Sequence, residues 1–380
     1  FSVEIPVLRI KRNIADIILA KTRTTLADLE NRINMTKKPT GFPTGIKVYG
    51  GSEIIVKKSD TRNVIMLLPG EDELLKNEYL IIGGHFDHLG MGGSSSRAGD
   101  TIAVHHGADD NASGVGEMIE LAEKFALTEG SHKRSIIFAA FSGEELGLLG
   151  SKYFAENPLI DLTKVNAMIN LDMVGRLRDS SALQFGGAGT AEGLKDLVTS
   201  LSDTNILKLT ITEEGSGPSD HSSFYSKNIP VLFFSTGAHI DYHTPSDTWD
   251  KINYPGMVKV SDLVFDIAEK LANDTARLKF KEAGPKVEIN RAMRRKGVTL
   301  GIMPDFAGNI KNGLRADLVT PGKPAALGGM KKGDIITSIN GKTVNNIQDY
   351  MFRMGQLKHG ETISIEVLRN GKKEVLLIQL

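Results

Sequence analysis

Side chains that can bind a metal recur after short apolar runs along this sequence. The candidates are His85, Asp110, Glu145, Asp172 and His243, with a further carboxylate, Glu144, beside Glu145. The apolar runs that precede four of them read as β-strands and cover residues 79–82, 136–138, 167–169 and 231–234. In open α/β folds, ligands bind at the carboxyl ends of parallel strands, where residues distant in sequence converge. The pattern therefore predicts a metal site at one edge of a sheet.

The residue types favour zinc and a hydrolytic reaction. The chain has no cysteine, so a zinc site here uses imidazole nitrogen and carboxylate oxygen. Two-metal sites hold their ions about 3.5–4 Å apart, and they need a bridging carboxylate and a base that is not a ligand. Adjacent Glu144 and Glu145 offer one ligand and one base, because neighbouring side chains diverge on a strand-to-helix turn.

Composition narrows the range of partners. The 380 residues include 46 basic and 46 acidic side chains, and no apolar run approaches a membrane span. This balance argues against bulk binding of nucleic acid or membrane. Residues 286–380 carry 16 basic and 8 acidic side chains, a net charge of +8, so the remainder carries −8. The expected metal site lies in the acidic part.

The order of elements predicts an α/β fold. From residue 79 to about 272, short apolar runs alternate with helical periodicity, which is typical of βαβ units and a mainly parallel sheet. We expect a three-layer arrangement with helices on both faces. One helix should start after Asn111 and Ser113, beside Asp110.

Other segments predict further elements and a domain boundary. We expect helices over residues 14–33 and 258–278, and strands over 45–49 and 63–68 that extend the same sheet. Gly284 and Pro285 mark a boundary, which gives a first domain over 1–283, including an N-terminal segment over 1–44, and a second over 284–380. Two alternating runs, 362–368 and 374–378, flank Asn370-Gly371, a strong hairpin signal.

Five motifs, taken in chain order, resemble those of the co-catalytic dizinc aminopeptidases. They are His85-Phe86-Asp87, residues 107–114, residues 141–145, residues 170–173 and Tyr242-His243-Thr244. The resemblance covers about residues 45–275. It implies two zinc ions bridged by Asp110, with Glu145 and His243 on one ion and His85 and Asp172 on the other.

The same resemblance implies roles for residues that are not ligands. Glu144 would be the general base, and Asp87 would hydrogen-bond the far ring nitrogen of His85. Tyr242 would donate a hydrogen bond to the tetrahedral oxyanion, with an interior structural tyrosine as the alternative. His221 would line the substrate pocket or be a structural histidine.

The loop between the first two ligands departs from the shorter relatives. It runs from His88 to Gly107 and is longer here, so side-chain specificity cannot be transferred. Asp109 need not be a ligand, and His105 and His106 read as surface loop residues.

The C-terminal part resembles a PDZ domain of the type appended to bacterial proteases, on residues 298–302, 324–336 and 339–341. Such domains bind an extended peptide and catch its terminal carboxylate on loop N–H groups. By the resemblance, Leu300, Gly301 and Ile302 form that loop and bind a peptide or protein C-terminus. The alternative is a degenerate PDZ domain that packs on the first domain and regulates or stabilises it.

These features predict a metal-dependent exopeptidase, most directly an aminopeptidase that acts on peptides. A glutaminyl cyclase-like enzyme with one zinc, a carboxypeptidase that uses Arg176 to hold a carboxylate, and a non-catalytic peptide-binding relative are the alternatives. The family resemblance suggests an exported protein, although no signal segment is visible. Residues 5–10 resemble the tail of a protease-associated insert, which would make the native protein longer.

Overall fold

The computed structural model describes residues 10–39, 41–47, 49, 58–93, 95–99, 101–286, 298–304, 312–345 and 347–380. The chain divides into two compact units, residues 1–59 and residues 60–380. Among the described residues, no helix combines the length and the apolar character that crossing a membrane requires.

The N-terminal unit contains two short helices rather than the single helix predicted over 14–33. These are α1 (Arg12–Leu19), followed by a 3₁₀ turn (Ala20–Thr22), and α2 (Leu26–Thr36). Thr25 starts α2 with a capping box: its hydroxyl accepts the Asp28 N–H at 3.2 Å, and the Asp28 carboxylate accepts the Thr25 N–H at 2.9 Å. The prediction of a single helix is wrong because the Thr25-x-x-Asp28 cap starts a second helix.

A mixed sheet forms the centre of the second unit, in the order β1-β3-β2-β4-β7-β5-β6. The four adjacent strands β3, β2, β4 and β7 are mutually parallel, whereas β1 and β5 pair antiparallel with β3 and β7. The strands are β1 (Val64–Leu68), β2 (Tyr79–His85), β3 (Ser135–Phe141), β4 (Val165–Leu171), β5 (Ala182–Gly186), β6 (Lys208–Ile211) and β7 (Val231–Ser235).

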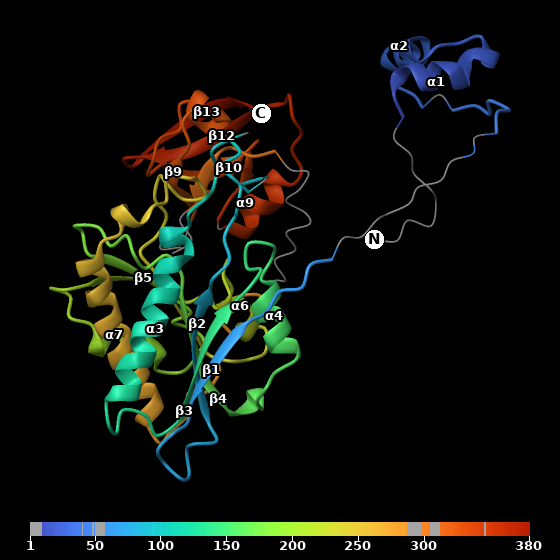
Figure 1. Ribbon diagram of the computed structural model, residues 1–380. Coiled ribbons are helices and arrows are strands. Elements are labelled where there is room, and N and C mark those ends of the chain that lie inside the picture. Colours follow the sequence, from blue (N-terminus) through green and yellow to red (C-terminus); the bar gives the residue numbers. More distant parts are fainter. Residues whose placement is uncertain are drawn as a thin grey trace. The chain divides into compact units, whose positions relative to one another are not determined.

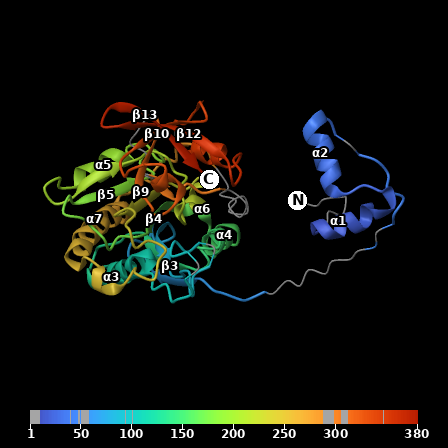
Figure 2. The same cartoon turned by 90° about the horizontal axis from the view of Figure 1, so that it is seen from above.

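Helices cover both faces of this sheet, which gives the three layers that the sequence predicts (Figure 1). One cluster of buried side chains joins the sheet to α3, α5 and α7, and another joins it to α4 and α6. Figure 2 shows α3 and α7 on one side of β3 and β4, with α4 and α6 on the other. The helices are α3 (Gly114–Leu127), α4 (Leu149–Glu156), α5 (Leu194–Leu201), α6 (His221–Tyr225) and α7 (Tyr254–Asn273), with 3₁₀ turns at Leu162–Lys164 and Trp249–Lys251.

The central strands are apolar along their whole length because both faces are covered. Every residue of β3 and β4 is buried, as expected for parallel strands between two helical layers. The predicted α/β class and mainly parallel central strands are confirmed. The strand expected over 45–49 is wrong for the described residues 45–47 and 49, which are not in a strand. A strand needs a pairing partner, and β1 already fills the free edge of β3.

The C-terminal part is a separate antiparallel sheet with its own core of buried side chains. Its strands run in the order β13-β12-β10-β9-β8, and β11 pairs with β10. The predicted hairpin is confirmed, since β12 and β13 pair across a turn in which Asn370 and Gly371 have φ of 49° and 77°. The elements are β8 (Ile302–Pro304), β9 (Leu314–Val319), α8 (Pro324–Leu327), β10 (Ile335–Ile339), β11 (Lys342–Thr343), α9 (Ile347–Met354), β12 (Thr362–Arg369) and β13 (Lys372–Gln379).

Candidate metal centre

The candidate ligands gather at the carboxyl ends of the four parallel strands. His85 is the last residue of β2, Asp172 directly follows β4, and Glu145 follows β3. Asp110 lies in the turn Ala108–Ser113 that leads into α3, and His243 lies in the loop after β7. Residues separated by up to about 160 positions thus meet at one edge, as the strand pattern predicts.

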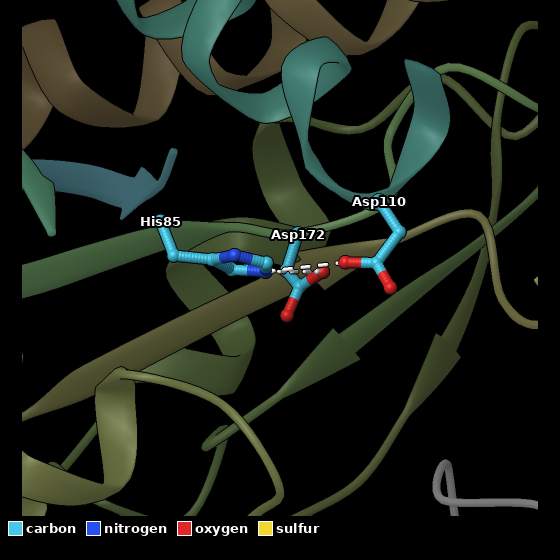
Figure 3. A group of neighbouring side chains, drawn as sticks. All are labelled: His85, Asp110 and Asp172. Atoms are coloured by element: carbon cyan, nitrogen blue, oxygen red, sulfur yellow. Dashed lines mark ion pairs between the residues drawn. The ribbon is translucent and has the colours of Figure 1, made fainter. Parts of the chain in front are cut away.

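One group of side chains is formed by His85, Asp110 and Asp172, which point toward one another (Figure 3). The His85 Nε2 atom lies 3.3 Å from Asp110 Oδ1 and 3.7 Å from Asp172 Oδ1. His85 and Asp110 are buried.

A second group uses the other oxygen of the same aspartate. The His243 Nε2 atom lies 3.2 Å from Asp110 Oδ2 and 3.1 Å from Glu145 Oε1. Asp110 therefore presents one carboxylate oxygen to each histidine, which is the arrangement of a carboxylate between two metal ions.

Backbone carbonyls set the tautomers of both histidines. The Nδ1–H of His85 donates to the carbonyl oxygen of Asp87 at 3.0 Å, and the Nδ1–H of His243 donates to that of Ser95 at 3.0 Å. Nε2 of each ring therefore faces the carboxylates of the site and is the nitrogen that a metal ion would bind, which is how outer partners prepare imidazole ligands.

The carboxylate of Asp87 has a different role from the expected one. It lies 3.8 Å from His85 Nδ1, and it accepts the backbone N–H groups of Glu144 at 2.9 Å and Glu145 at 3.2 Å. Asp87 thereby holds the turn that carries the two glutamates. The contact to the far nitrogen of His85 comes from the Asp87 main chain.

Asn111 and Asp247 position Asp110 at the start of α3. The Asn111 amide donates to the carbonyl of Leu171 at 2.9 Å and accepts the N–H of Gly114 at 3.1 Å, which ties the helix to the end of β4. The Asp247 carboxylate accepts the N–H groups of Asp109 and Asp110 at 2.9 and 3.1 Å.

The carboxylates of the site favour positive charge beside them. Burial alone lowers the pKa of His243, but Asp110 and Glu145 outweigh it and raise that pKa to about 10. Burial also lowers the pKa of His85, but Asp110 and Asp172 outweigh this effect. They raise that pKa well above its ordinary value. Clustered carboxylates thus stabilise cationic charge at the two positions that metal ions would occupy.

Buried atoms without partners support the same conclusion. Asp110 Oδ2 and Glu145 Oε1 are buried and have no hydrogen-bond partner among the residues that the structure describes, although buried polar groups almost always have one. Imidazole nitrogen and carboxylate oxygen are donors that zinc accepts. The residues therefore fit zinc.

Sequence reasoning missed three residues around this centre. The His88 ring lies beside Glu145 and Asp110, Asp247 supports the turn of Asp110, and His239 Nε2 lies 3.0 Å from Asp109 Oδ2. Only His88 carried a signal, because it is a third polar residue in the segment that begins with His85.

The loop histidines differ from expectation in one case. His106 is exposed, as predicted, but His105 is buried, so its assignment to the surface is wrong. Its Nε2 lies 2.8 Å from Ser96 Oγ and its Nδ1 donates to the Ala103 carbonyl at 3.0 Å. These two bonds inside the loop explain the burial.

Tyr242 and His221 occupy different surroundings. The Tyr242 ring stacks on His243 with centroids 3.8 Å apart, at the candidate centre. His221 begins α6, is buried, and stacks on Phe233 at 4.6 Å. Burial lowers the pKa of His221 to about 3, so its ring is neutral at physiological pH.

The predicted carboxylate-binding loop of the second domain is partly buried. Leu300 belongs to the core of that domain and its carbonyl accepts the Ala325 N–H at 2.9 Å. Gly301 has φ of 74° and Ile302 begins β8.

Fold and site together describe an α/β protein with a candidate metal centre of imidazole and carboxylate side chains. Comparison with known proteins identifies the family. Residues 63–268 match the model of peptidase family M28, and residues 299–380 match that of the PDZ domain. Because the first match spans more than half of the chain, the chain belongs to peptidase family M28. The resemblance drawn from the motifs is confirmed at this level.

Individual relatives agree with the family. The chain is 38% identical over 130 residues to a "Probable zinc metalloprotease" of Pyrenophora teres f. teres, which is 34% of this chain and 26% of the relative. It is 32% identical over 177 residues to "Aminopeptidase YwaD" of Bacillus subtilis, which is 43% of this chain and 38% of the relative. The chain thus spans well under half the length of either. The solved aminopeptidase of Aneurinibacillus sp. strain AM-1 is 29% identical with a TM-score of 0.45, over 58% of this chain and 49% of that one.

Proposed function

We propose that this protein is an aminopeptidase that removes the N-terminal residue of peptides with two zinc ions and Glu144 as general base. The observation that carries the proposal is the position of Asp110 between two histidines. Its Oδ1 lies 3.3 Å from His85 Nε2 and its Oδ2 lies 3.2 Å from His243 Nε2. A carboxylate shared in this way suits a bridge between two ions.

Family membership and the donor set support the metal assignment. His85, Asp110 and Asp172 would hold one ion, and Asp110, Glu145 and His243 the other. When bound, zinc in such a site polarises a carbonyl and makes water a better nucleophile at neutral pH.

Glu144 is the side chain assigned to proton transfer. It is buried, and the Asp87 carboxylate holds its backbone N–H, so the turn presents it beside the ligand Glu145. Glu144 takes a proton from the attacking water and delivers it to the amine that leaves.

Tyr242 is assigned to stabilise charge on the substrate oxygen. Burial, followed by the nearby carboxylates of Asp110 and Glu145, raises the pKa of Tyr242 well above its ordinary value. The phenol therefore keeps its proton at neutral pH and can donate a hydrogen bond to an oxyanion. Binding of substrate by His221 stays a prediction, and its neutral stacked ring also suits a structural role.

For the second domain we propose binding of a peptide or protein C-terminus at Leu300, Gly301 and Ile302. The positive φ of Gly301 and the start of β8 directly after it support this assignment, because PDZ domains add a peptide strand beside such a loop. The division at residues 283 and 284, and an exported location, also stay proposals.

The alternatives make different demands on the site. A carboxypeptidase needs a cation for the terminal carboxylate, and Arg176 is already paired with Asp241 at 2.6 Å, which weighs against that role. A glutaminyl cyclase-like enzyme with one zinc needs only one ion, whereas Asp110 faces two histidines. A non-catalytic relative would not need Glu144, which is present.

Peptide cleavage tests the proposal directly. The zinc-loaded protein is incubated with one mixed peptide in free and N-acetylated forms, and the products are read by mass spectrometry. Stepwise loss of residues from the free amino end alone, abolished by a chelator, is the expected result. Trimming of both forms from the carboxyl end would replace it with a carboxypeptidase assignment, and no cleavage of either form would favour the cyclase or binding-protein readings.

A further inference from the structure

His88 is a partly buried histidine beside the candidate metal centre that the assigned ligand set does not use. Its Nδ1 lies 3.2 Å from Glu145 Oε1 and 3.7 Å from Asp110 Oδ2. Its side chain is 9% exposed, and neither ring nitrogen has a hydrogen-bond partner in the described ranges of the chain. His88, Asp110 and Glu145 form a group able to hold an ion.

The spacing of these atoms matches ligands of one ion. Zinc bonds to nitrogen and oxygen are about 2.0–2.2 Å long, so ligands of a tetrahedral ion lie about 3.3–3.6 Å from one another. His243 Nε2 lies 3.2 Å from Asp110 Oδ2 and 3.1 Å from Glu145 Oε1. The two distances from His88 Nδ1 to the same oxygens bring to four the number of ligand-to-ligand distances in such a tetrahedral arrangement.

The relation between His88 and Glu145 also supports their binding to one ion. His88 Nδ1 and Glu145 Oε1 are close enough to hydrogen-bond, yet within the described part of the chain neither atom makes a hydrogen bond of suitable geometry. Atoms that are close but do not face one another directly can face a common third point, which is how ligands surround an ion.

The loop from His88 to Gly107 packs the ring into this place. Gly107 has φ of 63°, and a Cβ there would lie 2.7 Å from His88 Cγ, so the backbone approaches the ring closely. On another side, the His243 ring meets His88 edge-on with centroids 5.7 Å apart. His88 is therefore held between the start of the Asp110 turn and a ligand.

We propose that His88 is a fourth protein ligand, through Nδ1, of the ion bound by Asp110, Glu145 and His243. The two metal positions then differ: one has three protein ligands and the other has four. This inference rests on the proposed function for the presence of two ions. The ion beside His243 would then be bound more tightly, and the ion beside His85 would have the more open coordination.

The test uses cobalt(II) in place of zinc and counts coordinated histidines by proton NMR. A coordinated imidazole gives one strongly shifted, solvent-exchangeable N–H signal. His85 and His243 account for two such signals, and coordination by His88 adds a third from its Nε2–H. The spectrum of the full chain is compared with those of His88→Gln and His88→Ala, and with His105→Gln as a matched control in the same loop.

Metal content adds a second readout. Both His88 variants should lose one exchangeable signal and bind one of the two ions at least about 100-fold more weakly, because loss of an outer partner alone typically costs 10–100-fold. His105→Gln should keep all three signals.

Each outcome decides a different question. Two exchangeable signals in the parent, unchanged in folded His88 variants, would overturn the ligand assignment while leaving the aminopeptidase proposal intact. Failure of the parent to bind two ions would instead overturn the two-metal function on which the inference rests. Circular dichroism of both variants establishes that they are folded.

Discussion

The different roles proposed for the adjacent Glu144 and Glu145 are the feature of this centre that mutation can test most simply. Glu145 faces His243, whereas Glu144 is the proposed base on the same turn. Glu144→Gln should keep its metal and lose about 10²- to 10⁴-fold in kcat, because general-base catalysis contributes that much. Glu145→Gln should lose metal as well as activity.

Metal analysis and steady-state kinetics of both variants separate the two tasks. Near-normal turnover by Glu144→Gln would remove it as the base. An unchanged metal count in Glu145→Gln would remove Glu145 from the ligand set.

Glu117 predicts how stability depends on pH away from the centre. It lies on α3, and neither of its carboxylate oxygens has a hydrogen-bond partner among the described residues. Burial, and after it the charge of Asp262 on α7, raises its pKa well above the ordinary 4.5. The folded state therefore holds a proton that the unfolded state releases above pH 4.5. This contribution to stability is complete below that pH and is lost as the pH rises through the folded pKa.

Replacing Glu117 by glutamine keeps the side chain neutral at every pH. The metal-free Glu117→Gln variant should be more stable than the metal-free parent at pH 8, by about 1–3 kcal/mol, with a smaller difference at pH 5. Urea unfolding at both values measures this. A difference that does not change with pH would mean that the Glu117 carboxyl group has the same pKa in the folded and unfolded states.

At the scale of elements, close approach of strands and helices limits what the sheet can accept. A Cβ at Gly84, in β2, would lie 2.5 Å from the Leu171 carbonyl oxygen at the end of β4. Gly84→Ala should therefore destabilise the protein by about 1–3 kcal/mol and disturb His85, the next residue.

Gly116 provides the matched control on α3. An added Cβ there meets nothing within 4 Å, so Gly116→Ala should stabilise the protein by about 0.5–1 kcal/mol through helix propensity and chain entropy. Thermal unfolding of the two variants gives the comparison. Equal effects of both substitutions would show that crowding between β2 and β4 is not what requires glycine at position 84.

The elements that the sequence predicts well are those with a strong local signal. Continuous apolar runs predict β2, β3, β4 and β7, and Asn370-Gly371 predicts the hairpin of β12 and β13. The helix predicted over 258–278 is displaced, because α7 already begins at Tyr254, with Pro255 in its first turn and Asn253 as its cap. Strands β5 and β6 were missed because they have only five and four residues, too few for their alternation to stand out from loop sequence.

The candidate centre could be predicted only as far as residue type and strand position allow. The five candidate ligands could be named because each follows a recognisable run or motif, and their role as ligands stays a prediction. His88 and Asp247 were missed because nothing local shows that a loop will fold back onto the metal side chains or onto the turn of Asp110. Long-range contacts of this kind depend on the folded chain.

At the scale of the whole molecule, the two domains have separate hydrophobic cores. The chain at the proposed boundary contacts the first domain, since the Tyr225 hydroxyl donates to the Gly284 carbonyl at 2.6 Å and accepts the Ala283 N–H at 2.9 Å. A chain that ends at Lys286 should therefore fold and keep the metal content of the full chain, although it loses the contact of Arg97 with Thr320.

Circular dichroism and metal analysis of this shortened chain test the prediction. A product that is insoluble, or that cannot be loaded with metal, would mean that the second domain stabilises the first. A soluble, loaded product would leave the second domain free for partner binding.

The convergence of ligands from four strand ends has a thermodynamic consequence. An ion that binds only the folded arrangement draws the population toward it, so the apparent stability becomes a function of free zinc concentration. Each tenfold rise in free zinc above the dissociation constant adds about 1.4 kcal/mol per ion. Zinc supply would then set not only how fast this protein works but how long it survives, because unfolded chains are the ones that proteases remove.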